Sequence, residues 1–576
     1  MWPFTTKYPE KTLQDAVVAG EYDYIIVGGG TAGCVVASRL SEDANVKVLV
    51  IEKGFVNDSL ATRVPLTSCT FDAVPGNVAR QTEPNEVCEG KRLSLVHSES
   101  LGGCSRINGM LYTRGLPAIY DEWASITGFE EWNWRGVEPY FERLESKLEQ
   151  TPGRASVQVV QHPPMFGLYK FLEDASSSMG LPVVNQPNQP NAPAAGYSYL
   201  DYTIDSEGNR HSALRSFLPT DLAIERQGRL TICTGVIATS LELDVADGRV
   251  KGVHVKPVGR EEPEFLAARR EVILCGGAIL TPQLLQLSGV GPASVLERVG
   301  LEVKRDLPAV GVGFNDHYGI PICLELPFDQ TYHFMERNIL QGIYQFVRFC
   351  VWGTGFLRSP ATQAAINFKS SCVDAKSSEI VLGADELDGT KLANLPDVEV
   401  MIVPANTVPG SNVGKSLATL FTCLLRPKSE GKIQVWTTDP EADPEIHTDV
   451  LTDQEDVAVA RKALRFSMAL AERLSRTAAD AFPSRIFLAP KNDTDDELDE
   501  FARVHIRAIL HHSSSCRMGR EDKGGVVDGN LRVHGFSNLR VADASVFPTI
   551  PATHTMAPTY MVAERCADLI RKTWAD

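Results

Sequence analysis

The chain has 576 residues, of which 43% are apolar and 22% charged, enough to build about two to four domains around a sizeable core. Its 45 glycines and 34 prolines match average usage, which excludes a collagen-like or wholly disordered chain. The net charge of −17 repels phosphate backbones and anionic lipid, so nucleic acid and membrane surfaces are expected to be poor partners.

Residues 1–21 carry charged side chains and lack the apolar run of a secretory signal, so a cytoplasmic location is expected. The twelve cysteines are scattered and form no C-x-x-C pair. That distribution is typical of a reduced intracellular protein, and no metal site is predicted.

Residues 22–54 are predicted to form a strand–helix–strand unit, with an apolar run at 24–27 and a second one at 47–51. Between them lies the pattern Gly28-x-Gly30-x-x-Gly33, and Glu52 ends the second strand. In this context the pattern predicts a dinucleotide site, with pyrophosphate at the helix N-terminus and Glu52 on a ribose hydroxyl. A glycine-rich turn without a ligand is the alternative, and the pattern does not separate FAD from NAD. The candidate contacts are Gly28, Gly30, Thr31, Ala32, Gly33 and Glu52.

A second glycine pair, Gly102-Gly103, allows either close approach to a bulky ligand or an ordinary surface turn. Residues 229–257 are predicted to be a strand meander with a hairpin turn at 246–248. Residues 271–300 indicate a strand and a helix capped by Thr281, with Pro282 at its first position. The apolar stretch from Ile339 to Gly355 is interrupted by polar residues and is predicted to be a buried helix.

The end of the chain returns to α/β character, with a strand at 539–543 and a helix at 557–572. We therefore expect the two ends of the chain to build one nucleotide-binding domain, with a second domain inserted between them. His511 and His554 flank this returning strand, and their placement favours proton transfer over a structural role.

Taken together, these motifs resemble the glucose-methanol-choline (GMC) flavoprotein oxidoreductases over nearly the whole chain. The segments 101–115 and 277–291 are similar to the two signatures of that family, and 311–317 and 538–545 to further family blocks. The similarity is greatest to the fungal branch of aryl-alcohol oxidases and versicolorin B synthase, which suggests secondary metabolism.

The resemblance implies bound FAD and an α/β fold, α+β overall. A Rossmann-like FAD-binding domain would hold an inserted substrate domain built on a large antiparallel sheet packed against helices. The expected FAD-binding domain is discontinuous, over 20–115, 205–315 and 505–576, and the substrate-binding domain covers 116–204 and 316–504.

The resemblance also implies site residues. His511 matches the family's catalytic histidine, and His554 matches its partner position. The residues expected to contact the cofactor in addition to the fingerprint are Gly103, Asn108, Gly109, Met110, Ala238, Asp543, Ala544, Thr555 and Met556.

The chain departs from the family pattern at three places. Cys104 precedes Ser105 where the family has two serines, Glu99-Ser100 replaces a basic residue, and Ser514-Ser515 precedes Cys516 where Gly-Thr is common. The last variant is similar to versicolorin B synthase, in which FAD accompanies a cyclisation without net redox change.

The predicted function is FAD-dependent oxidation of a primary or benzylic alcohol, with His511 as the base and oxygen or a quinone as the electron acceptor. The alternative is a non-redox cyclase or lyase that uses the same histidines, and a catalytically inactive binding protein is less favoured. The oligomeric state and the covalent or non-covalent attachment of FAD stay open.

Overall fold

The first of two large sheets is built from strands of the N-terminal, middle and C-terminal parts of the chain. The computed structural model describes residues 7–66, 76–146, 155–408 and 414–575. The strand order is β11-β2-β1-β14-β13-β12, and β26 also pairs with β14. The strands are β1 (Tyr22–Val27), β2 (Val48–Glu52), β11 (Leu230–Thr234), β12 (Val236–Asp244), β13 (Arg249–Pro257), β14 (Glu264–Leu274) and β26 (Leu539–Val541).

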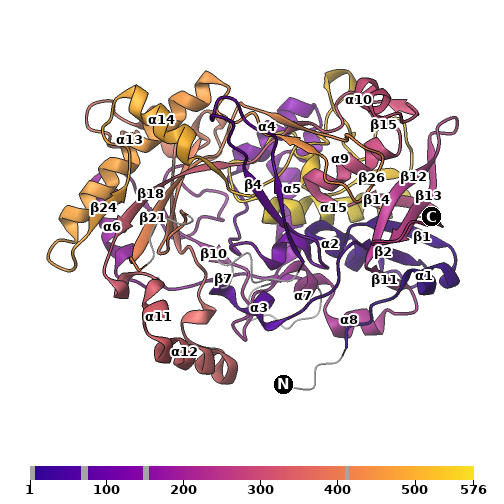
Figure 1. Cartoon of the computed structure of the whole chain (residues 1–576), viewed down its shortest axis with the longest axis horizontal. Helices are drawn as coiled ribbons and strands as arrows, with labels where there is room; N and C mark the ends of the chain where they lie inside the picture. Colours follow the sequence, from indigo (N-terminus) through magenta and orange to yellow (C-terminus); the bar gives the residue numbers. More distant parts are fainter. Residues whose placement is uncertain (1–6, 67–75, 147–154, 409–413, 576) are drawn as a thin grey trace.

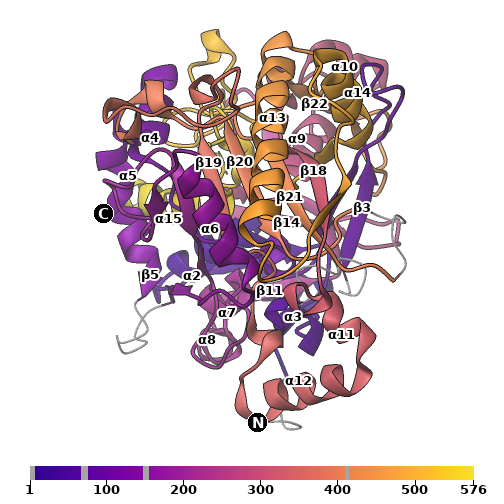
Figure 2. The ribbon, with the colours of Figure 1, turned by 90° about the vertical axis from the view of Figure 1, so that its left-hand side faces the viewer.

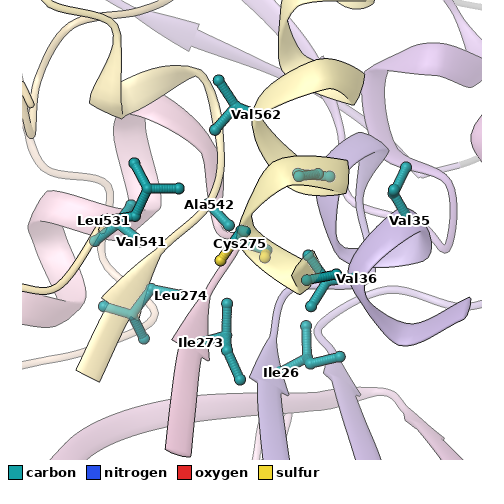
Figure 3. Packing of buried hydrophobic residues seen from close by; sticks show 14 of the residues in the cluster. Ile26, Val35, Val36, Ile273, Leu274, Cys275, Leu531, Val541, Ala542 and Val562 are labelled. Atoms are coloured by element: carbon teal, nitrogen blue, oxygen red, sulfur yellow. The ribbon is translucent and has the colours of Figure 1, made fainter. Parts of the chain in front are cut away.

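Strand β14 pairs with different strands along its two halves. Its first half pairs antiparallel with β13, and its second half pairs parallel with β1 and β26. The predicted hairpin joins β12 to β13, but β11, which was expected in the same meander, pairs in parallel with β2 instead. The predicted strand–helix–strand unit is present as β1, helix α2 (Thr31–Leu40) and β2. Helices α2 and α15 (Met556–Thr573) pack together on this sheet, and Val36 of α2 lies beside Ile26 of β1 (Figure 3).

The second large sheet lies beside the first (Figure 1) and has the order β24-β18-β21-β20-β19-β9-β8, with β25 on β18. All its pairs are antiparallel except β8 with β9. The expected fold class is therefore confirmed. The strands are β8 (Val183–Val184), β9 (Gly196–Tyr199), β18 (Tyr318–Glu325), β19 (Ala364–Phe368), β20 (Val398–Val403), β21 (Leu417–Leu424), β24 (Arg485–Leu488) and β25 (Arg507–Ala508).

The two faces of this sheet have different neighbours. Side chains alternate along a strand, and Val398, Val400 and Ile402 of β20 are buried in a core with helix α13 (Gln454–Thr477). Helices α6 (Leu168–Ser178) and α14 (Asp495–His505) pack against α13 on this side (Figure 2). The residues between them, Glu399 and Met401, therefore point to the opposite face.

The helix after β14 begins earlier than predicted. Helix α9 spans Gly277–Leu287, so Thr281 and Pro282 lie inside it and not at its start. A proline in a helix leaves the carbonyl four residues earlier without its usual donor. Here the hydroxyl of Ser515 donates to the carbonyl of Ala278 at 2.6 Å, which satisfies that oxygen and allows the helix to continue through Pro282.

The segment predicted to be a buried helix is a helix, but it is not buried. Helix α12 spans Ile339–Trp352, follows the short helix α11 (His333–Arg337), and projects from the body of the protein in Figures 1 and 2. Its apolar residues face solvent, with Ile339 and Leu340 about three-quarters exposed, at 75% and 74%. The interrupted apolar run therefore predicted the helix correctly and its burial wrongly, because composition does not show which side of a helix faces the protein.

The predicted division into two domains stays a prediction. Two separate apolar cores do accompany the two sheets. Helices α4 (Pro117–Thr127) and α5 (Trp134–Leu144), which the division assigns to the substrate domain, bury Trp123 and Phe141 in the core of the first sheet.

Strand β26 is held to β14 by a buried ion pair, which supplies the first testable prediction. Arg540 and Glu271 are 0% and 1% exposed and lie 2.6 Å apart, and Arg540 also donates to the carbonyl of Asn530. Replacing Arg540 by methionine leaves a buried carboxylate without its cation, which costs about 3–5 kcal/mol. We expect a lower midpoint in urea unfolding, followed by circular dichroism.

The matched control is Arg520→Met, which removes an exposed ion pair with Asp522. It should leave the midpoint unchanged. Equal midpoints for Arg540→Met and the parent protein would contradict the importance of the buried pair.

Candidate active site

A long cavity begins at the carboxyl ends of β1 and β2 and reaches the predicted histidines. Most residues predicted from the sequence line it, but Gly33 and Met110 do not. Met110 is fully buried in a small apolar cluster beside Leu111 and Tyr202. The predicted residues that line the cavity are Gly28, Gly30, Thr31, Ala32, Glu52, Gly103, Asn108, Gly109, Ala238, His511, Asp543, Ala544, His554, Thr555 and Met556.

The glycines of the first turn have different physical roles. Gly28 has a φ of +100°, and a Cβ there would lie 2.5 Å from the carbonyl oxygen of Cys275. A Cβ on Gly33 would lie 1.9 Å from the carbonyl oxygen of Gly28, so Gly33 serves the close packing of helix on strand. A Cβ on Gly30 would meet no protein atom closer than 3.8 Å, so this position is open toward the cavity.

Two buried carboxylates hold the walls of the cavity. Glu52 accepts hydrogen bonds from the backbone N–H groups of Gly29 and Gly54, both at 2.8 Å, and so fixes the glycine turn. Asp543 accepts from the N–H of Gly277 and the hydroxyl of Thr281, and so joins the end of β26 to the start of α9. Burial raises the pKa of both carboxyl groups.

The sequence reasoning missed a charged group that lines the cavity. Arg80 contacts His97 and forms ion pairs with Glu99 at 2.8 Å and Asp443 at 2.6 Å. Asp443 belongs to the loop between β22 (Gly431–Gln434) and β23 (Glu445–His447), which also covers the cavity through residues 440–442. No motif connects Arg80 to that loop, 363 residues later in the chain.

Three imidazole rings and one carboxylate form a row at the other end of the cavity. Nε2 of His511 lies 3.2 Å from Nδ1 of His554, and Nε2 of His554 lies 3.1 Å from Oε1 of Glu399. On its other side, Nδ1 of His511 lies 2.8 Å from Nδ1 of His317. The structure thus brings the two predicted histidines together and adds His317 and Glu399.

The backbone around His511 is held in place by Asp316. This buried carboxylate accepts from the N–H of His511 at 2.6 Å and from the N–H of Leu510 at 3.2 Å. Leu510 has a φ of +70°, which is uncommon for a leucine and aims the following residue into the cavity. Burial raises the pKa of Asp316 to about 8.

Two rings of the row, His511 and His317, are kept unprotonated by their surroundings. Burial lowers the pKa of His511 well below its ordinary value, and the neighbouring His554 and His317 add to this effect. Burial also lowers the pKa of His317 to about 3 and that of His512 to about 4. His511 is therefore unprotonated at neutral pH, as a general base must be.

Two signals could have identified the missed partners of His511. Glu399 is the single charged residue in the strand Val-Glu-Val-Met-Ile-Val, and a lone carboxylate in a buried strand needs a partner. His317 ends the block 311–317, which was used only as a sign of the family.

The serine run after His512 contacts backbone and not the imidazole row. Ser515 donates to the carbonyl of Ala278, and Ser514 donates to the hydroxyl of Ser513. The hydrogen bonds of the His511 ring go to His317 and His554. The run therefore supports helix α9 and the strand ends around it.

Known proteins resemble this chain over nearly its whole length. It is 33% identical over 563 residues to the oxygen-dependent choline dehydrogenase of Pectobacterium carotovorum, covering 96% of this chain and 95% of that protein. The enzyme of the same description from Chromohalobacter salexigens is 32% identical over 569 residues, covering 96% and 95%.

Solved structures agree in fold. The formate oxidase of Aspergillus oryzae superposes with a TM-score of 0.84 at 26% identity, covering 96% of this chain and 99% of that one. A fungal aryl-alcohol oxidase superposes with a TM-score of 0.80 at 24% identity, covering 96% and 100%, and this likeness shows the fold alone. The two family models described as GMC oxidoreductase match residues 22–319 and 427–563. The chain therefore belongs to the GMC oxidoreductase family, with FAD as its cofactor.

Proposed function

We propose that this protein oxidises an apolar primary or benzylic alcohol to the aldehyde, with His511 as the general base. The observation that carries the proposal is the row His317–His511–His554–Glu399 at the end of the cavity that begins at the dinucleotide fingerprint. Bound FAD supplies the acceptor for the hydride that leaves the carbinol carbon, and oxygen or a quinone then takes the electrons.

The imidazoles have separate roles in this proposal. Nε2 of His511 takes the hydroxyl proton, a contribution of about 10²–10⁴-fold in rate. The ring of His554 hydrogen-bonds the same oxygen through Nδ1 and is held at Nε2 by Glu399. His317 and the Asp316 carboxylate are positioning residues, because they act on His511 through its ring and its backbone.

An apolar cluster beside Glu399 on β20 favours an apolar substrate. Met401 and Val403 follow Glu399 on the same face of β20 and gather with the partly buried Phe421 and Ile509. A quaternary ammonium group is recognised by aromatic faces and a free carboxylate. The carboxylate of Glu399 is already hydrogen-bonded to His554, and the rest of this cluster is uncharged. The fungal aryl-alcohol oxidase branch stays a prediction, since the curated relatives described above are bacterial.

The cofactor-binding residues are likewise proposed, and Gly30 gives a sharp test of them. Valine at position 30 fits the protein but would project into the cavity, where FAD must pass close to the backbone. We expect Gly30→Val to give a folded, colourless protein whose absorbance lacks the flavin bands.

The matched variant is Gly33→Ala, whose Cβ would collide with the carbonyl of Gly28 and not with the cofactor. It should lower the thermal midpoint of unfolding. A soluble Gly30→Val protein that is fully loaded with FAD would overturn the assignment of this turn.

The reaction is tested by anaerobic mixing with benzyl alcohol, a primary aliphatic alcohol and choline. We expect flavin bleaching with benzyl alcohol and with the aliphatic alcohol. Bleaching with choline should be at least about tenfold slower, because the apolar side chains beside Glu399 solvate a cation poorly. Under air, one electron acceptor should be consumed per aldehyde. Sustained anaerobic turnover with oxidised flavin and no acceptor would instead identify the non-redox cyclase or lyase.

The histidines are separated by substitution. His511→Ala should slow flavin reduction at least about a hundredfold with normal FAD content, because the base is lost. His554→Asn should be milder than His554→Ala, since an amide can still form a hydrogen bond with the substrate oxygen. His512→Ala should matter less than either, because the His512 ring lies 3.6 Å from Asp316 and outside the row. An active His511→Ala beside an inactive His512→Ala would refute these roles.

A further inference from the structure

Helix α12 presents its apolar side to solvent and its polar Gln345 to the protein. Gln345 and Phe349 are its buried residues, and the side-chain oxygen of Gln345 accepts from the N–H of Phe356. At 100° per residue, the outward side chains cover an arc of about 160°. They are Ile339, Leu340, Ile343, Tyr344, Phe346, Val347, Cys350 and Val351. We call this set the α12 face.

The α12 face lies on a convex projection of the molecule. Figures 1 and 2 both place α11 and α12 at one extremity, beyond the sheets. Trp352, at the C-terminal end of the helix, lies outside this arc but is also exposed, at 65%. Large exposed apolar patches mark surfaces that meet a partner or a membrane.

The part of the chain around α12 has a positive net charge, whereas the whole chain is negatively charged. Residues 337–373 contain four basic residues and no acidic residue, within a chain of net charge −17. Arg337 and Arg348 form no salt bridge within the described ranges, and the Arg348 guanidinium lies 5.7 Å from the ring centre of Tyr344. Both cations are thus available to anionic groups beside the apolar side chains.

We propose that α12 is an interfacial anchor that docks this protein on an anionic lipid bilayer. The helix would lie parallel to the surface, with the α12 face among the upper acyl chains and Arg337 and Arg348 at the headgroups. An apolar face with aromatic residues, flanked by arginines, is the pattern of such helices.

Two features favour a lipid surface over other occupants. A helix of 14 residues is about 21 Å long, shorter than the 30 Å hydrocarbon core, and among the described residues no helix is long and apolar enough to cross a membrane. A protein partner covers a narrower stripe of a helix, whereas an apolar arc of about 160° on a projection suits immersion. The earlier expectation against membranes used the net charge, which does not describe this segment.

The test is co-sedimentation of the FAD-loaded protein with vesicles of phosphatidylcholine, alone or with 30% phosphatidylserine. We expect binding to the mixed vesicles at least about tenfold tighter than to phosphatidylcholine, because each arginine near an anionic surface contributes about fivefold. The variant Ile343→Asp/Val347→Asp should lose at least about tenfold of this binding, with FAD content and turnover of a water-soluble alcohol unchanged.

The matched control is Val18→Asp, which places the same charge at a valine that is 76% exposed on α1 (Leu13–Ala19). It should bind vesicles like the parent protein. Equal binding by Ile343→Asp/Val347→Asp and the parent protein would overturn the proposal. So would a lipid-free dimer in sedimentation velocity that this variant dissociates, since the α12 face would then be covered by a second copy.

Discussion

A neutral imidazole has one N–H and one lone pair, and this constraint orders the protons along the histidine row. An ionised Glu399 only accepts, so Nε2 of His554 carries a proton toward it. In the closed neutral row, Nδ1 of His554 then accepts from His511, and Nδ1 of His511 accepts from His317. In this state the nitrogen that faces His554 is a donor and not a base.

The row becomes a base only when the proton of His317 changes place. If His317 carries its proton on Nε2, its Nδ1 accepts from His511, and Nε2 of His511 presents a lone pair to the cavity. The carbonyl groups of Leu425 and Pro551 favour a protonated His317 ring, against the larger effect of burial. In the proposed mechanism His317, which does not touch the substrate, therefore sets the proton-accepting state of His511. Asp316 adds the positional part, because it fixes the backbone of His511.

The sequence predicted the elements whose formation depends only on residues close to them in the chain. The turn at Gly28–Gly33 lies between a strand and a helix that form from neighbouring residues, so its place in the fold followed directly. The start of α9 was misplaced because the donor that makes Pro282 tolerable is Ser515, more than two hundred residues later. Glu399 and His317 were missed for a similar reason. Alternation tells which residues share a face of β20, but only the packing of α13 shows which face meets the site. The same ambiguity of facing applies to α12.

The residues that identify the family differ in kind from the residues that select the substrate. The family resemblance depends on positions such as Gly28 and Gly33, where a Cβ would collide with backbone, so any member with this turn must keep them. The apolar cluster of Met401, Phe421 and Ile509 carries no such constraint, because one apolar side chain can replace another of similar volume without changing the fold. One-third identity to choline dehydrogenases across the chain therefore supports FAD as the cofactor and an alcohol oxidoreductase activity. It does not transfer choline, because the substrate is chosen by side chains that the shared backbone leaves free to vary.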